Sequence, residues 1–219
     1  MKKLKAVGLV AAVAVFMVAA SGISKADDIQ IGGLVSFAPT SSSNCASPTT
    51  GCQSVTFSNL TVLATNPSES INPSTTSVSF PTFDLGFWGS AATFNPMSGA
   101  LSVSINGQTL TGNIAWENLV ATGSGGFQLD VSLNGLTGGG TDSVLGAFAA
   151  HGQGSGILTF QFTAGSLNSD QALVDSKTGL SNNSLSATLS TPEPASLGLF
   201  GIGLLALAFV YRRRLKALA

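Results

Sequence analysis

Residues Leu101–Trp116, LSVSINGQTLTGNIAW, decide the fold class of this chain. Apolar residues alternate with serines over positions 101–105, and Asn106-Gly107 follows at once. Alternation with a period of two is typical of a half-buried strand, and Asn-Gly favours a tight hairpin turn because both residues tolerate positive φ. The returning strand has its apolar face at Leu110, Ile114 and Trp116. The stretch therefore predicts an antiparallel β-hairpin.

The same pattern recurs along residues 27–180. Clear alternating runs are Phe127–Leu133, which Asn134-Gly135 follows, and Leu158–Phe162; weaker runs are Ile29–Phe37, Val55–Leu63, Val78–Leu85 and Leu185–Leu189. Away from the two ends, no stretch keeps a helical period, although Ser143–Ala150 fits either a helical turn or another strand. We therefore expect an all-β domain of about eight to ten short strands, an antiparallel β-sandwich or jelly roll.

Charge is scarce and strongly segregated. Charged residues make up 9% of the chain, and eight of the nine Lys and Arg lie before position 26 or after position 211. Residues 27–194 hold Lys177 and all ten acidic residues, a formal charge of −9. Lys and Arg that neutralise phosphates supply most of the affinity for nucleic acid. Nucleic-acid binding is therefore excluded as the function of this segment.

The amino end has the three parts of a secretory signal peptide. Basic residues open the chain, an apolar run extends from Ala6 to Ala20, and small residues at Ser24 and Ala26 precede Asp27. This order predicts cleavage by signal peptidase between Ala26 and Asp27. Cleavage near Ala20 or Ser21 is the alternative.

At the carboxyl end, fourteen apolar residues, Leu197–Val210, precede Arg212-Arg213-Arg214. A helix of that length covers roughly 21 Å, whereas the hydrocarbon core of a bilayer is about 30 Å thick. Extending the helix to 195–211 reaches the lower limit of a transmembrane span. Because basic residues stay in the cytoplasm, this orientation puts residues 27–191 outside.

The last residues resemble a known sorting signal. Pro192-Glu193-Pro194, the short apolar helix and the arginine cluster are similar in order and spacing to the PEP-CTERM signal of Gram-negative bacteria. The resemblance covers Thr191–Ala219. It implies that the proline-glutamate-proline motif is recognised by an exosortase, a membrane protease-transpeptidase, and that the three arginines are the stop. By analogy it also implies a surface or exopolysaccharide matrix setting, with a tail that is either cleaved or kept as an anchor.

Together these predictions divide the chain into four parts. We expect a signal peptide at 1–26, an exported β-domain at 27–180, a Ser/Asn-rich linker or last strand at 181–191, and a sorting tail at 192–219. The protein is thus expected to cross the inner membrane of a Gram-negative bacterium and to reach the envelope, the cell surface or the medium.

The two cysteines, Cys45 and Cys52, lie in a polar loop with Pro and Gly between them. In an exported protein such a pair predicts a disulfide rather than a redox or metal site, because the spacing matches no redox motif and no histidine is near. The bridge would close a short loop between the first two strands.

The sequence offers little for catalysis, and we predict a protein that is not an enzyme and has no cofactor. The sequence has one histidine, His151, but no G-x-S-x-G motif that would place a nucleophilic serine for it to activate. Five carboxylates could supply the pair that a glycoside hydrolase needs, but no spacing pairs them: Glu69, Asp84, Glu117, Asp130 and Asp142. No metal site is predicted, since Asp170 and Asp175 are only a weak match to a calcium loop.

Two tryptophans are the candidates for ligand binding. Trp88 lies between glycines and Trp116 lies on a predicted strand, so either could stack on a sugar ring; the competing interpretation is that both fill the core. The leading prediction is a non-enzymatic surface or matrix protein. A carbohydrate-binding or adhesive module is the alternative, and a polysaccharide hydrolase a further one.

Overall fold

The computed structural model of the chain describes residues 26–40, 52–66, 68–88, 91–123, 125–162 and 180–192. All of these residues except Ala26 belong to one compact unit, Asp27–Pro192, which we call the body. The predicted signal peptide up to residue 25 and the predicted helix at 195–211 lie outside the described residues. Among the residues that are described, no helix has the length and hydropathy needed to cross a membrane.

Ten strands make up most of the described chain. In chain order they are β1 (Asp28–Pro39), β2 (Cys52–Asn66), β3 (Ser77–Ser79), β4 (Phe83–Trp88), β5 (Ala91–Asn95), β6 (Ser98–Ile105), β7 (Gln108–Gly123), β8 (Gly126–Gly138), β9 (Gln153–Gln161) and β10 (Leu180–Ser190). The helical elements are the 3-10 helix η2 (Pro73–Thr75) and α2 (Ser143–His151). Every strand pair is antiparallel.

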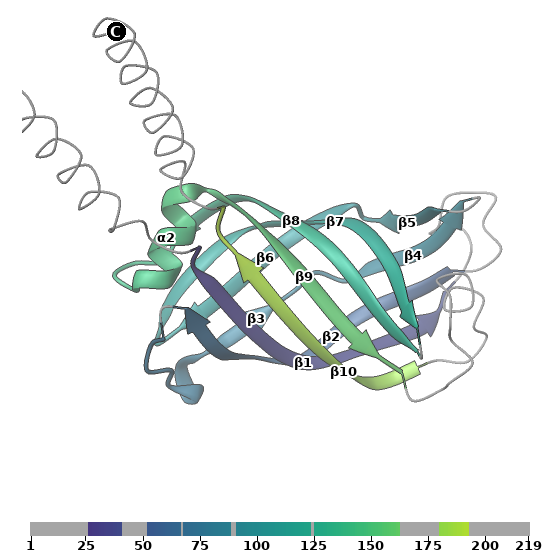
Figure 1. Cartoon of the computed structure of the whole chain (residues 1–219), viewed down its shortest axis with the longest axis horizontal. Coiled ribbons are helices and arrows are strands. Elements are labelled where there is room, and N and C mark those ends of the chain that lie inside the picture. The colour runs from purple at the N-terminus through teal and green to yellow at the C-terminus, as the bar shows by residue number, and fades with distance from the viewer. Residues whose placement is uncertain are drawn as a thin grey trace, which may run out of the picture. The chain divides into compact units, whose positions relative to one another are not determined.

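The strands form one curled sheet in the order β3-β6-β7-β8-β9-β10-β1-β2-β4-β5 (Figure 1). The curl brings distant strands face to face: Phe57 on β2 stacks on Trp116 on β7, with ring centroids 5.8 Å apart. The predicted all-β, antiparallel class is confirmed. The opposed sides of this single half-barrel enclose the core as the two layers of a sandwich do.

The two Asn-Gly dipeptides have different roles. Asn106 and Gly107 form the predicted turn between β6 and β7 with φ of 51° and 79°, and the Asn106 side chain also bonds to the backbone of Asn72 and Ser70. Asn134-Gly135, which follows the alternating run at 127–133, does not end the strand, because β8 continues to Gly138. Gly135 uses its φ of 60° inside the strand, where the pairing with β7 shifts register. The irregularity behaves as a β-bulge.

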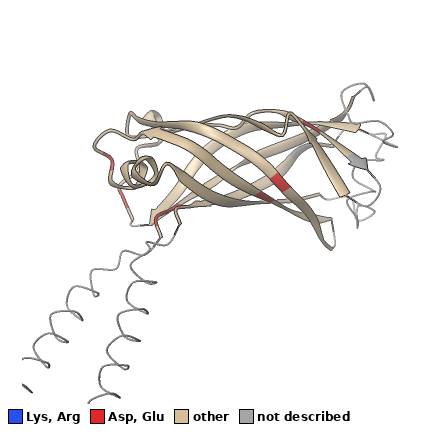
Figure 2. Ribbon diagram, turned by 90° about the horizontal axis from the view of Figure 1, so that it is seen from above, with Lys and Arg blue, Asp and Glu red and all other residues tan. Residues whose placement is uncertain are grey.

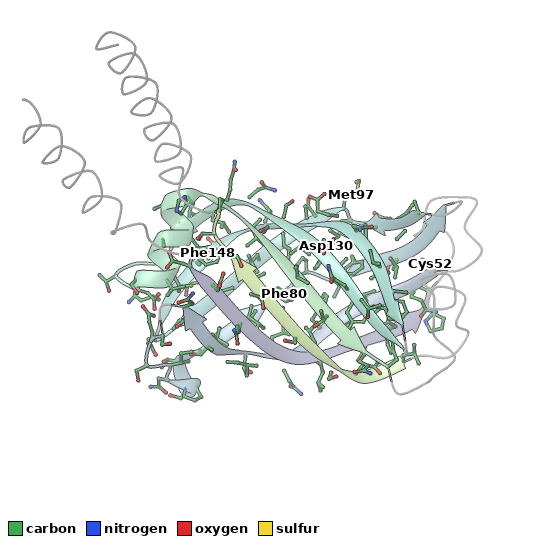
Figure 3. The ribbon with its side chains drawn as sticks, viewed as in Figure 1. Cys52, Phe80, Met97, Asp130 and Phe148 are labelled. Atoms are coloured by element: carbon green, nitrogen blue, oxygen red, sulfur yellow. The ribbon has the colours of Figure 1, made fainter. Side chains whose placement is uncertain are left out.

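The ambiguous Ser143–Ala150 stretch is helix α2. Asp142 is its N-cap and accepts hydrogen bonds from the backbone N–H groups of Val144 and Leu145. Gly152 ends it in the left-handed conformation, with φ of 66°. Buried Val144, Leu145 and Phe148 pack α2 over one end of the core, and Figure 3 labels Phe148 there. We call this end of the body the α2 end.

Aromatic side chains fill much of the remaining core in two clusters. One cluster consists of Phe37, Phe127, Phe160 and Phe162. The other consists of Phe57, Phe80, Phe83, Phe94 and Trp116. All apolar residues of the strong alternating runs point inward, which confirms the two-residue period as a guide to the core.

Phe160→Ala should lower the free energy of unfolding by about 3–5 kcal/mol, because it leaves a cavity among Phe37, Phe127 and Phe162. Urea unfolding measures the change. Met97→Ala is the control, since Met97 is 72% exposed and its truncation should cost no more than about 0.5 kcal/mol. Equal losses in the two variants would contradict the described core.

Candidate functional site

The chain enters and leaves the body at one point. The register of β1 with β10 pairs Asp28 with Ser190, so the residues just outside this pair, Asp27 and Thr191, also meet. The backbone N–H of Thr191 donates to the Asp27 carbonyl at 2.9 Å, and the Asp27 N–H donates to Thr191 Oγ1 at 2.9 Å. Thr191 is only 4% exposed. We call this reciprocal pair the terminal junction.

Strand β10 explains why the junction forms. The segment 181–191 was expected to be either a linker or a last strand, and it is a strand as far as Ser190. It lies between β9 and β1, hydrogen-bonded to both. Every second residue of the strand is buried, at Leu185, Ala187 and Leu189, and Thr191 continues this alternation. The body therefore extends past residue 180 to Pro192, with no linker before the sorting motif.

The predicted processing sites lie on either side of the junction. Ala26 and Asp27, the predicted signal cleavage pair, are half-buried directly before β1, while Pro192 is exposed directly after Thr191. The other predicted sorting residues lie outside the described part of the chain: Glu193, Pro194, Arg212, Arg213 and Arg214. Pro192, the first residue of the motif, is therefore also the first residue after the junction that the body leaves exposed.

The junction has an acidic electrostatic environment. Partial burial raises the pKa of the Asp27 carboxyl, the charge of His151 lowers it, and neighbouring Asp28 raises it further. His151 is the last residue of α2, so the single histidine of the chain lies near the junction and not beside a nucleophile. Cleavage after Ala26 would turn the Asp27 N–H into an α-ammonium group. That group can keep its hydrogen bond to Thr191 and gains attraction from the nearby carboxylates.

Two more carboxylates lie at the α2 end. The Ser143 hydroxyl, at the first residue of α2, donates to Glu69 Oε1, and Asp142 caps the helix. The described residues include seven Asp and Glu but neither Lys nor Arg, as the absence of blue in Figure 2 shows. Within the described residues, the negative charge of the body therefore has no Lys or Arg partner.

The remaining described candidate carboxylates, Glu117, Asp130 and Asp84, lie on β7, β8 and β4. On the outer face of the sheet, Glu117 accepts a hydrogen bond from Ser132, and Asp130 accepts one from Gln128 at 2.8 Å. Glu117 lies at a register shift between β7 and β8. Asp84 lies on β4. Within the described residues, no group of three or more His, Cys, Asp or Glu side chains could hold a metal ion, and Asp170 and Asp175 lie outside them.

Trp116 is not placed to bind a sugar. Trp116 is 3% exposed, and the centroid of its ring lies 4.4 Å from that of Phe83. This residue therefore fills the core. Its indole Nε1 is buried with no hydrogen-bond partner among the described residues. A buried ring cannot stack on a ligand from solvent. The side chain of Trp88 lies outside the part of the structure that is described.

Cys52 is disulfide-bonded and begins β2, at the end of the body opposite α2 (Figure 3). The sequence has one other cysteine, Cys45, which lies outside the described residues.

Comparison with known protein families finds the PEP-CTERM protein-sorting motif at residues 190–214. The match begins at Ser190, the last residue of β10, and includes Thr191 of the terminal junction. It confirms the resemblance drawn from the tail and implies sorting by an exosortase to the Gram-negative envelope or surface. No curated protein and no solved structure matches the chain.

Thr191→Val should lower the stability of the body by about 1–3 kcal/mol, because it removes the acceptor of the partly buried Asp27 N–H while keeping the side-chain volume. Urea unfolding of the purified protein measures the loss. Thr188→Val, at a half-buried position on the outer face of the same strand, is the matched control and should change stability by at most about 0.5 kcal/mol. If Thr191→Val were as stable as the control, the junction would contribute nothing.

Proposed function

We propose that this chain is an exported, non-enzymatic surface or extracellular-matrix protein that its carboxyl-terminal tail holds at the membrane until an exosortase processes it. The observation that carries the proposal is the sorting motif at 190–214, which begins where the central strand β10 ends. We expect signal peptidase and the exosortase to process the chain. The processed protein would lie among the exopolysaccharide of the matrix.

The geometry of the junction supports display of the body. Because Asp27 and Thr191 meet, both the signal peptide and the sorting tail attach at the α2 end. The opposite end, where Cys52 lies, is the end farther from both attachments (Figure 3). The acidic surface without described Lys or Arg disfavours adhesion of the body to anionic lipid headgroups. A tethered body of this kind presents its outer sheet face and its far end to the surroundings.

The arrangement of the candidate acids supports the non-enzymatic part of the proposal. Retaining and inverting glycosidases both need two carboxyl groups that flank one bond in a cleft. Glu117 and Asp130 instead lie on the outer face of the sheet, each holding a neighbouring polar side chain. The interaction found for the His151 side chain within the described residues is with the Asp27 carboxylate, and not with a nucleophile. A polysaccharide hydrolase is thus the weakest of the three functions.

The proposal predicts processing at the tail in a host that has the protease. Mass spectrometry of the surface or secreted protein should find a chain that begins at Asp27 and lacks the peptide containing Arg212–Arg214. Deleting the exosortase gene, or changing Pro192-Glu193-Pro194 to alanines, should leave the tail in place and the protein in the membrane fraction. The matched control, Ser196→Ala, should be processed normally.

Recovery of the intact arginine-containing terminus from mature surface protein in the unmodified host would contradict exosortase processing and indicate a permanent anchor.

A further inference from the structure

A groove opens on the outer face of the sheet where the ends of β7, β8, β9 and β10 lie side by side. Its volume is about 330 Å³. Its walls are the outward-facing side chains of Thr122, Thr159, Gln161, Ser184 and Ser186, which alternate along the strands with residues of the core. The buried residues Phe127, Phe160 and Leu185 form its floor. The core cluster of Phe37, Phe127, Phe160 and Phe162 thus packs beneath the groove.

A glycine keeps the groove open. Gly126 lies in register with Gln161, which in turn pairs with Ser184, so it occupies the middle of the outer face at this point. A Cβ on Gly126 would come within 2.6 Å of Thr122 Oγ1. Any side chain at this position would therefore displace the Thr122 hydroxyl and fill the space between the walls.

The walls combine hydroxyl and carboxamide groups, and none of the lining residues is charged. Such groups both donate and accept hydrogen bonds, so they suit a neutral ligand that carries many hydroxyls of its own. The Thr159 hydroxyl donates to the Ser186 carbonyl at 3.2 Å, which orients its oxygen lone pairs for a second partner. Ile157, two residues before Thr159 on the same face of β9, is 47% exposed and offers an apolar contact for ring C–H groups.

We propose that this groove binds a short segment of a neutral polysaccharide. Trp116 is buried and cannot contact a sugar, whereas the groove can. The groove would recognise the sugar through hydrogen bonds of hydroxyl and amide groups instead of aromatic stacking. None of the candidate carboxylates lines it, so the groove would bind without cleaving.

The position of the groove suits a protein tethered by its tail. Thr191 comes seven positions after Ser184, about 20–24 Å further along the direction of β10. The groove is therefore well away from the junction at the α2 end and open on the outer sheet face. Binding needs only the folded body, so the inference does not rest on processing by the exosortase, and either proposal can fail without the other.

Affinity electrophoresis of the exported protein tests the proposal, because the acidic body migrates well in native gels. The gels contain dextran, galactomannan or hydroxyethylcellulose, with alginate as the acidic comparator. At least one neutral polysaccharide should retard the protein. Ser186→Phe, which fills the groove, should weaken retardation at least about tenfold, and Thr159→Val, which removes one hydroxyl, by about three- to tenfold.

Thr61→Phe is the matched control. Thr61 is exposed on β2 in the same transverse row as Ser186, since both pair with Gly32 on β1, but it lies outside the groove. Its retardation should stay within about twofold of the unmodified protein. Thermal unfolding followed by circular dichroism verifies that each variant is folded. Retardation by none of the neutral polysaccharides, by alginate alone, or equal weakening by Thr61→Phe and Ser186→Phe would overturn the proposal.

Discussion

The antiparallel pairing of β10 with β1 holds the two ends of the body together in one sheet. It joins the last strand to the first, so the sheet order runs β8-β9-β10-β1-β2 without interruption through the middle of the half-barrel. Nine register pairs hold β1 to β10, and the reciprocal hydrogen bonds of Asp27 and Thr191 continue this pairing by one residue. Removing β10 would expose two sheet edges and open the core.

The same pairing gives the sorting tail its starting point. A tail on a flexible linker would allow the body any orientation, whereas here the motif follows the buried Thr191, which comes directly after the central strand β10. Pro192, the first residue of the motif, therefore leaves the body at the α2 end, where Asp27, Asp28 and His151 also lie. The outer face, with its hydroxyl-lined groove, stays at a distance along β10. The sorting motif and the proposed display of the body thus both depend on β10.

Much of this could be predicted from the sequence, but not how the strands join. The two-residue alternation at 101–105 and 127–133 identified strands and core correctly, because burial of one sheet face imposes that period. It could not tell one curled sheet from two, nor a turn at Asn134-Gly135 from a bulge, since both need only a positive φ. The junction was missed because Thr191 resembles a linker residue, although its parity with Leu185 and Leu189 was a usable signal. The groove depends on register across four strands, which no local pattern encodes.

Amide hydrogen exchange in the exported, processed protein measures whether β10 is part of the folded sheet. If β10 is a central strand, the amides from Leu185 to Leu189 should exchange as slowly as those of β8 and β9, since they open only with the whole sheet. The Thr191 amide, which donates to the Asp27 carbonyl, should also be protected. Exchange of this segment at the rate of an unstructured linker would contradict the position of β10 in the sheet. The sorting tail would then follow a flexible linker and not a strand of the body.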